Sequence, residues 1–261
     1  MTSMLEIIAA RTRAELPQLR DEWNCLAREP LPAAASGAFS RALRSTGLSI
    51  IAEIKRQSPS AGPLAREVDP AARALEYARG GAVAVSVVTQ REFFGGSARD
   101  LAAVTRVISG LPVLQKDFFL DLVQFDLARA RGADAVLIIA ALVGDRLQEM
   151  LAEATRRGLD CLVEVHSENE LDAALAAGST LIGINNRNLR TLQIDLGTAL
   201  ALIRCMPPHV TTVAESGIRS IDDVRRMRDA GFHAILVGEA FMRAENPAAL
   251  VEEFARAGSR S

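Results

Sequence analysis

The sequence predicts an α/β fold, a (β/α)8 TIM barrel with an N-terminal helical extension. After about residue 48 the chain repeats one pattern of a short β-branched run, a loop, an amphipathic helical segment and a Gly or polar turn. Successive strand ends are spaced by roughly 20–35 residues, which is the length of one βα unit. Eight such units in about 215 residues match the usual size of this barrel.

A doubly wound open sheet is the structural alternative, because it alternates strands and helices in the same way. Such a sheet usually carries a Gly-rich phosphate loop, GxGxxG, directly after its first strand. The first predicted strand is followed instead by "KRQSPSAG", residues 55–62, which lacks that motif. We therefore prefer the barrel.

Composition excludes several classes of protein. The 261 residues are 49% apolar, which is enough for a large core, and a net charge of −2 offers no bulk attraction for nucleic acid. Cys25, Cys161 and Cys205 lie far apart without CxxC spacing, which fits a reducing cytoplasm and argues against a disulfide scaffold or a zinc site. The apolar runs are too short for a membrane span or a signal peptide. We expect a cytoplasmic protein with no nucleic-acid or membrane partner.

Residues 1–47 precede the first repeat, and we expect them to form a helical extension packed on the barrel of residues 48–261, all within one domain. The stretch "MLEIIAARTRAELPQLRDEWNCLA", residues 4–27, has apolar positions near helical spacing, interrupted by Pro17. The stretch "REPLPAAASGAF", residues 28–39, is typical of a connecting loop.

Eight later segments have the composition of buried strands. They are residues 48–55, 82–89, 112–117, 134–140, 161–166, 180–186, 210–216 and 234–239. Between them lie Ala-, Leu- and Arg-rich helical segments that end at Gly, such as 69–80, 121–132, 145–158 and 220–231. The last of these begins with Ser220 as the expected N-cap, with Asp223 three residues on.

Polar side chains end five of the predicted strands, and in a barrel of this class the active site lies at that edge. They are Glu53, Lys55, Lys116, Glu164, Asn185, Arg187 and Glu215. Because side chains alternate along a strand, Glu53 and Lys55 point in the same direction. That pair alone could be a solvated ion pair. Charged groups on so many strands are costly to bury together without a function, so we expect them to converge on one pocket.

A candidate anion site follows the seventh and eighth predicted strands. Ser216 and Gly217 come after the seventh strand, and Gly238 comes after the eighth. Small residues allow backbone N–H groups to approach a ligand, and these two loops commonly bind phosphate in such barrels. Two ordinary glycine turns would give the same pattern, but Lys55 and Arg187 could supply the cations that a phosphorylated substrate requires.

Six stretches together resemble the motif series of the indole-3-glycerol-phosphate synthase family of tryptophan biosynthesis. They are "AEIKRQSPS" (52–60), "LPVLQKDF" (111–118), "LVEVH" (162–166), "IGINNRNL" (182–189), "VAESGI" (213–218) and "LVGEAFM" (236–242). The resemblance runs from about residue 48 to 243, and "SVVTQREFFGGSARDL" (86–101) also fits it. It implies a carboxy-lyase that converts 1-(2-carboxyphenylamino)-1-deoxyribulose 5-phosphate to indole-3-glycerol phosphate, carbon dioxide and water.

The resemblance also implies roles for the charged residues. Lys116 matches the general acid that protonates the substrate carbonyl oxygen, and Glu164 matches the general base. Lys55 matches a second catalytic lysine that contacts the substrate carboxylate, and Glu53 matches the carboxylate that orients it. Ring closure develops charge at a carbonyl oxygen and dehydration needs both an acid and a base, so these residue types suit the chemistry.

The remaining assignments concern substrate positioning. Asn185 and Glu215 match positioning groups, while the residues that align with substrate or phosphate contacts are Ser58, Arg187, Ser216, Gly217 and Gly238, with Phe94 and Phe118 as apolar walls. His166 shares a face with Glu164, and we expect it to be a packed or hydrogen-bonded neighbour of Glu164 and not a base. Decarboxylation is driven by the return of aromaticity, so neither a metal nor an organic cofactor is implied.

Two other functions remain open on the sequence alone. One is a phosphosugar aldolase or isomerase barrel in which Lys55 or Lys116 forms a Schiff base. The other is a non-catalytic barrel that binds a phosphorylated ligand. We expect a monomer whose partner is its small-molecule substrate, and contacts with other enzymes of the tryptophan pathway stay open.

Overall fold

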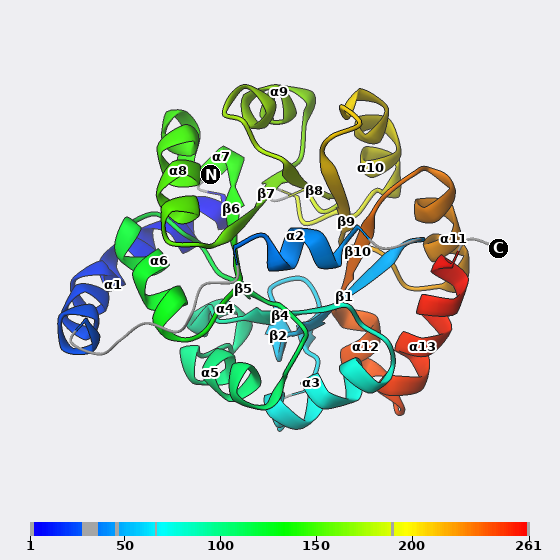
Figure 1. The fold of residues 1–261 in the computed structure, drawn as a ribbon, viewed down its shortest axis with the longest axis horizontal. Helices are drawn as coiled ribbons and strands as arrows, with labels where there is room; N and C mark the ends of the chain where they lie inside the picture. Colours follow the sequence, from blue (N-terminus) through cyan, green and yellow to red (C-terminus); the bar gives the residue numbers. More distant parts are fainter. Residues whose placement is uncertain (1–2, 28–35, 45–46, 66, 189–190, 260–261) are drawn as a thin grey trace.

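The computed structural model describes residues 3–27, 36–44, 47–65, 67–188 and 191–259. Its centre is a closed barrel of eight parallel strands in the order β1-β10-β9-β8-β7-β6-β5-β4 (Figure 1). The strands are β1 (Ser49–Ile54), β4 (Ala84–Val88), β5 (Val113–Lys116), β6 (Ala135–Ile139), β7 (Asp160–Val165), β8 (Leu181–Asn185), β9 (Thr211–Glu215) and β10 (Ala234–Val237). The predicted (β/α)8 barrel is confirmed.

An outer ring of helices covers the strands, as Figure 1 shows. The helices that connect successive strands are α3 (Pro70–Arg79), α5 (Ala98–Val107), α6 (Leu122–Ala130), α8 (Leu147–Arg156), α9 (Glu168–Ala176), α10 (Leu196–Leu202) and α11 (Ile221–Asp229), and α13 (Pro247–Gly258) follows the last strand. The expected N-cap of α11 is present, because Ser220 accepts a hydrogen bond from the backbone N–H of Asp223.

Short elements occupy several loops and were not predicted. They are the antiparallel pair β2 (Gln57–Ser58) and β3 (Gly62–Pro63), the helices α4 (Arg91–Phe94), α7 (Ala140–Val143) and α12 (Glu239–Arg243), and the 3-10 turns η1 (Gly144–Arg146) and η2 (Ile203–Cys205). Elements of two to five residues are too short to show a hydrophobic period, so the sequence pattern could not reveal them.

The expected N-terminal helix is present: α1 (Met4–Leu26) runs without a break through Pro17, where the apolar spacing of the sequence is interrupted. Proline removes one backbone hydrogen bond and costs about 3 kcal/mol inside a helix. Contacts with α6 oppose this cost, because α1 packs against it and Arg20 donates a 2.7 Å hydrogen bond to Asp121. The predicted loop at residues 28–35 lies outside the described residues.

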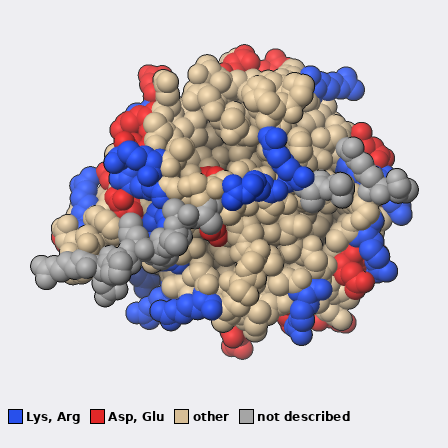
Figure 2. Space-filling view, in the orientation of Figure 1, with Lys and Arg blue, Asp and Glu red and all other residues tan. Residues whose placement is uncertain are grey.

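A short helix, α2 (Ala38–Ala42), lies across the amino end of the barrel (Figure 1), and its first two residues fall in the stretch 28–39 that was predicted as a loop. Phe39 and Leu43 are fully buried in the apolar cluster that fills the barrel interior. In the space-filling view of this face, basic side chains cross its centre and charges of both signs surround its rim (Figure 2). The amino end of the barrel is therefore closed by apolar side chains.

Apolar residues fill the barrel up to the level of the strand ends. Ile51, Leu114, Leu162 and Val213 belong to this interior cluster, and a larger cluster lies between the strands and the helices. The next inward-pointing residue on each of these four strands is charged. The fold therefore places a layer of ionisable groups on top of an apolar interior.

Candidate active site

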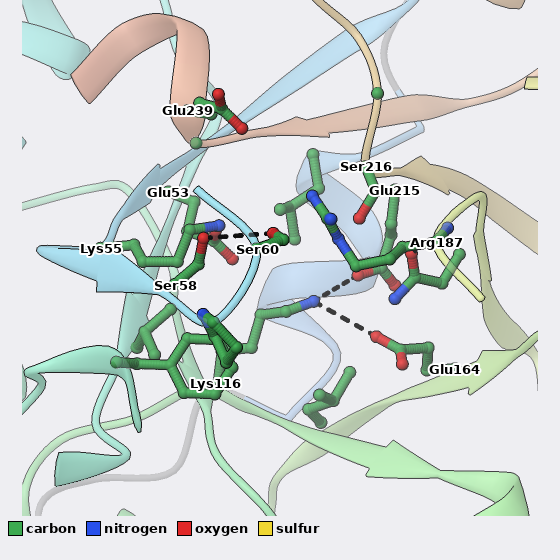
Figure 3. Close-up of a pocket in the computed structure, with 18 of the residues that line it drawn as sticks. Glu53, Lys55, Ser58, Ser60, Lys116, Glu164, Arg187, Glu215, Ser216 and Glu239 are labelled. Atoms are coloured by element: carbon green, nitrogen blue, oxygen red, sulfur yellow. Dashed lines mark hydrogen bonds and ion pairs between the residues drawn. The ribbon is translucent and has the colours of Figure 1, made fainter. Parts of the chain in front are cut away.

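A cavity opens at the carboxyl ends of the barrel strands, and every site residue singled out from the sequence lines it (Figure 3). These residues are Glu53, Lys55, Ser58, Phe94, Lys116, Phe118, Glu164, Asn185, Arg187, Glu215, Ser216, Gly217 and Gly238. Residues more than 180 positions apart in the chain thus share one space. The expected convergence is present.

Lys116 lies at the centre of the cavity, between two carboxylates. Its Nζ is 3.4 Å from Glu164 Oε2 and also contacts the carboxylate of Glu215 (Figure 3). Glu164 and Glu215 are 2% and 1% exposed, so both carboxylates depend on protein partners and not on water. An ammonium group in this position can donate a proton, and the amine that remains can take one back at the same place.

Glu53 and Lys55 form a second pair on the opposite side of the cavity. Lys55 lies one residue beyond the end of β1, and its Nζ contacts the carboxylate of Glu53. The two side chains therefore point in the same direction, as the alternation along the strand predicted. Lys55 is 19% exposed, and Glu53 is almost completely buried, so the carboxylate fixes the lysine at the cavity wall.

Two glycines make room for the buried carboxylates. A Cβ atom on Gly183 of β8 would lie 2.0 Å from Glu215 Oε1, and a Cβ atom on Gly238 would lie 2.5 Å from Glu53 Oε1. Glycine inside a strand often marks a close approach of this kind. The sequence suggested Gly238 as a phosphate contact, and the structure gives it this additional packing role.

Burial and neighbouring charges shift the pKa values of the central groups in opposite directions. Burial alone would lower the pKa of Lys116, but the carboxylates of Glu215 and Glu164 raise it well above its usual value. Burial would raise the pKa of Glu164, but Lys116 and His166 lower it. The pKa of Glu215 is raised, chiefly by burial. Two carboxyl groups whose pKa values are pushed apart can take different roles in acid–base chemistry.

Asn185 and Arg187 form the polar wall between β8 and β9. Asn185 pairs with Glu215 in the sheet register, and its Oδ1 accepts a 2.9 Å hydrogen bond from the backbone N–H of Arg187. Burial lowers the pKa of the Arg187 guanidinium. Asn186, which the sequence did not single out, donates 3.0 Å hydrogen bonds to the carbonyls of Glu215 and Ser216.

The candidate anion site has a strained backbone. Ser216 has a φ of +64° and Gly217 a φ of +85°. A left-handed conformation costs a non-glycine residue about 1 kcal/mol or more and is often found at functional sites. The N-terminus of α11 already binds its own Asp223, whose Oδ2 accepts from the backbone N–H groups of Arg219 and Ser220 at 3.1 and 3.0 Å. The backbone N–H groups of Arg219 and Ser220 are thus already bonded, whereas Ser216 and Gly217 line the cavity.

The apolar side of the cavity combines predicted and unpredicted residues. The predicted Phe94 and Phe118 lie together, with ring centroids 6.1 Å apart. Met4, Leu5 and Ile8 of α1 also line the cavity and were not predicted. The sequence predicted a helix packed on the barrel, but helical spacing alone does not show which barrel end the helix covers.

The lysines carry a signal that was missed in the sequence. Only two of the 30 Lys and Arg residues are lysines, Lys55 and Lys116, and both line the cavity. Lysine readily shifts its pKa and exchanges a proton, whereas the arginine guanidinium stays charged. Both lysines of the chain thus lie in this cavity, while every other basic side chain apart from histidine is an arginine.

Neither a cluster of metal ligands nor a membrane-spanning helix is found among the described residues. Within these ranges, no three His, Cys, Asp or Glu side chains are grouped as metal ligands. In the same part of the chain, every helix is too short or too polar to span a bilayer.

The fold and the site together define an enzyme of the (β/α)8-barrel class. Lysine and carboxylate side chains lie together at the carboxyl ends of its strands. A sequence profile of the indole-3-glycerol phosphate synthase family matches residues 5–254. The chain belongs to this family. It is 46% identical to an indole-3-glycerol phosphate synthase of Albidiferax ferrireducens (98% of this chain, 100% of the relative) and 42% identical to that of Desulfotalea psychrophila (93% and 95%). That of Exiguobacterium sibiricum is 46% identical (82% and 83%).

More distant solved structures share the fold alone. Thiamine phosphate pyrophosphorylase from Pyrococcus furiosus is similar with a TM-score of 0.62 and 17% identity, over 82% of this chain and 96% of that one. The 3-hexulose-6-phosphate synthase from Salmonella typhimurium has a TM-score of 0.65 and 13% identity, over 80% and 98%. These likenesses support the barrel and say nothing further about the reaction.

Proposed function

We propose that the cavity converts 1-(2-carboxyphenylamino)-1-deoxyribulose 5-phosphate to indole-3-glycerol phosphate, carbon dioxide and water, with Lys116 as general acid and Glu164 as general base. Membership of the indole-3-glycerol phosphate synthase family supports the reaction. The observation that carries the residue roles is the contact of Lys116 with both Glu164 and Glu215 at the base of the cavity.

In the first step, the ring carbon that bears the carboxylate attacks the ketone carbon of the sugar chain, and a carbon–carbon bond forms. The electron pair of the carbonyl bond moves to the oxygen, which takes a proton from the ammonium group of Lys116. A poised cation lowers this barrier because it neutralises the developing charge. Lys55 on the opposite wall is a cation for the carboxylate of the substrate, and Glu53 orients it.

In the later steps, carbon dioxide leaves and its bonding pair restores the aromatic ring. The new hydroxyl group then takes a proton from an ammonium group of the cavity and departs as water, while a base removes a proton from the neighbouring carbon to form the pyrrole double bond. Lys116 and His166 lower the pKa of Glu164, so its carboxylate is ionised and can act as the base. It lies beside Lys116, the general acid, and so faces the same part of the substrate. Asn185 and the carboxyl group of Glu215 position the substrate.

The phosphate end of the substrate fits the loops that follow β8, β9 and β10. Arg187, Ser216 and Gly217 line the cavity beside Gly238 and Ser58. The charged side chain of Arg187 and the N–H groups of a small-residue loop are suited to a phosphate. Phe94 and Phe118 then supply the apolar wall for the anthranilate ring.

The direct test is to mix the protein with this substrate, without added metal, and to follow the fluorescence of the indole product. We expect turnover in the parent protein. Lys116→Ala and Glu164→Gln should each lower kcat by at least about 100-fold, the usual scale for acid–base groups. Arg146→Ala, at an ion pair that is half-exposed on both sides, is the control and should keep its activity.

A parent protein that does not turn over this substrate would contradict the proposed reaction. Normal rates in both cavity variants would contradict the residue roles while leaving the reaction in place. The Schiff-base alternative is tested by borohydride reduction with substrate, followed by mass spectrometry. Because the chain has only two lysines, any trapped adduct is easy to assign. We expect neither lysine to be modified.

We further propose that the chain acts as a monomeric, single-domain cytoplasmic enzyme. The packing of α1 on α6 and the burial of Phe39 in the barrel support the single domain, because both N-terminal helices share the core of the barrel. Sedimentation measured over a range of concentrations tests the monomer, and a dimer at micromolar concentration would contradict it.

A further inference from the structure

His166 follows β7 and lies between two carboxylates. Its Nδ1 is 3.2 Å from Glu170 Oε2 and its Nε2 is 3.3 Å from Glu164 Oε1. The backbone N–H of His166 also donates a 2.8 Å hydrogen bond to Glu170 Oε2. The contact with Glu164 is an ion pair and not a well-aligned hydrogen bond. The imidazole therefore bridges the first turn of α9 and the proposed general base.

The two oxygens of Glu164 face different cations. Oε2 is 3.4 Å from Lys116, and Oε1 faces His166. Burial would lower the pKa of His166, but Glu164 and Glu170 raise it to about 10. Those two carboxylates are the charged groups that face the imidazole among the described residues. His166 is thus a cation at neutral pH, and charges of alternating sign run from Glu170 through His166 and Glu164 to Lys116.

This arrangement matters when Lys116 engages the substrate. A buried carboxylate without a cation takes up a proton, because burial disfavours the charged form. Glu164 would then lose its function as a base at the moment when Lys116 turns toward the carbonyl oxygen. His166 does not line the cavity among the described residues, so it can act only through Glu164.

We propose that His166 is a positioning residue for Glu164: a fixed cation that keeps Glu164 ionised and oriented while Lys116 serves the substrate, with Glu170 holding the imidazole in place. The inference rests on the proposed role of Glu164. The competing explanation is a purely structural link between β7 and α9. The two explanations differ in one respect, because only the first requires the positive charge.

His166→Gln separates them, since the NH2 group of glutamine can still donate a hydrogen bond to a carboxylate but carries no charge. We expect kcat to fall roughly 10- to 100-fold with little change in KM, because the loss concerns the ionisation of a base and not substrate binding. Loss of the cation raises the pKa of Glu164, so the acid limb of the kcat profile should move up by about one pH unit. His233→Gln, in a second histidine that contacts Thr212 at the other end of the barrel, is the matched control and should leave the profile unchanged.

A readout independent of activity is the ¹⁵N NMR spectrum of the imidazoles, since the chain has only three histidines. At pH 8 we expect a doubly protonated imidazole signal that is absent in His166→Gln and present in His233→Gln. Glu170→Gln removes one of the two groups that raise the pKa of His166, so its kcat should be lost at high pH, where the parent protein remains active. Wild-type kcat and pH profile in His166→Gln, or a neutral His166 at pH 8, would overturn the inference.

The outcomes also distinguish this inference from the proposed function. If the parent protein does not turn over the substrate, the proposed reaction fails, whatever the NMR spectrum shows. If the parent is active, Glu164→Gln is inactive and His166→Gln is normal, only the role of His166 fails.

Discussion

At the amino end of the barrel, Phe39 of α2 and Leu43 directly after this helix close the ring of strands, whereas at the carboxyl end the ring opens around Lys116. The polar groups of the closed end are well satisfied. Asp160 at the start of β7 accepts hydrogen bonds from the N–H groups of Gly37 (3.0 Å) and Ser40 (2.8 Å) and from the Ser40 hydroxyl (3.0 Å). The same strand thus begins in a stabilising network and ends in the candidate active site.

The open end carries groups that cost stability. Glu215 Oε1 is buried without a hydrogen-bond partner among the described residues, and Ser216 has a left-handed backbone. The carboxylates of Glu53, Glu164 and Glu215 contact the two lysines in the cavity. The difference teaches that contacts at the amino end stabilise the barrel, whereas strained and charged groups at the carboxyl end lower its stability. This division is expected where function requires such groups.

The largest expected effect tests whether the open end needs lysine or only a positive charge. Lys116→Arg keeps the charge between Glu164 and Glu215, but arginine does not give up a proton at these pH values. We expect kcat to fall about 1000-fold, within the range for loss of a general acid, and the melting temperature to change little. Steady-state kinetics and thermal unfolding measure the two quantities.

The control is the reverse substitution, arginine to lysine, at the amino end of the barrel. Arg44 donates a 2.7 Å hydrogen bond to Thr211 Oγ1, and Arg44→Lys should keep full activity. Substantial turnover in Lys116→Arg would show that the position requires only charge, and the general-acid role would then be wrong.

The second effect belongs to the closed end. Phe39→Ala removes a fully buried ring from the interior cluster, and such truncations lower the free energy of unfolding by about 3–5 kcal/mol. We expect about 3 kcal/mol, measured by urea denaturation, with KM and kcat of the folded protein within about twofold of the parent. A large loss of activity at normal stability would contradict the separation of the two ends.

The sequence predicted the parts of the fold that depend on local pattern. Strand period, helix-ending glycines and charged strand ends are encoded in short stretches, and the parallel barrel brings strand ends together by geometry. For this reason the meeting of Lys116, Glu164 and Glu215 could be expected from three separate segments.

The remaining features depend on tertiary contacts that a local pattern does not contain. The helix α2 has five residues and no period of its own, and α1 continues through Pro17 while it packs against α6. The space that Gly183 leaves for Glu215 becomes visible only when neighbouring strands are placed side by side. The same holds for His166. The strand alternation predicted that its side chain points to the same side as Glu164, but not that it also contacts Glu170 on α9.

A smaller effect is expected from the aromatic wall of the open end. Phe118→Ala removes a half-buried ring that packs against Phe94 with a centroid separation of 6.1 Å. We expect KM to rise roughly 5- to 10-fold, since an aromatic contact of this kind contributes about 1 kcal/mol, and stability to fall much less than in Phe39→Ala. An unchanged KM, or a loss of stability equal to that of Phe39→Ala, would mean that this ring belongs to the core and not to the substrate wall.

The smallest effect is the reactivity of the cysteine beside the closed end. Burial raises the pKa of the Cys161 thiol to about 12, while Cys25 and Cys205 are exposed. Only the thiolate reacts with iodoacetamide, so at pH 8.5 two cysteines should be labelled quickly and Cys161 at least about 100-fold more slowly, as followed by mass spectrometry.

Cys161 is half-buried, so a change in its labelling rate between variants reports how often the start of β7 opens, and this rate follows the stability when closing is fast. Phe39→Ala should therefore accelerate the reaction at Cys161, whereas Phe118→Ala should leave it nearly unchanged. Rapid labelling of Cys161 in the parent protein would show that the start of β7 is accessible in the native state, and the closed end would then lack the dry packing that distinguishes it from the cavity.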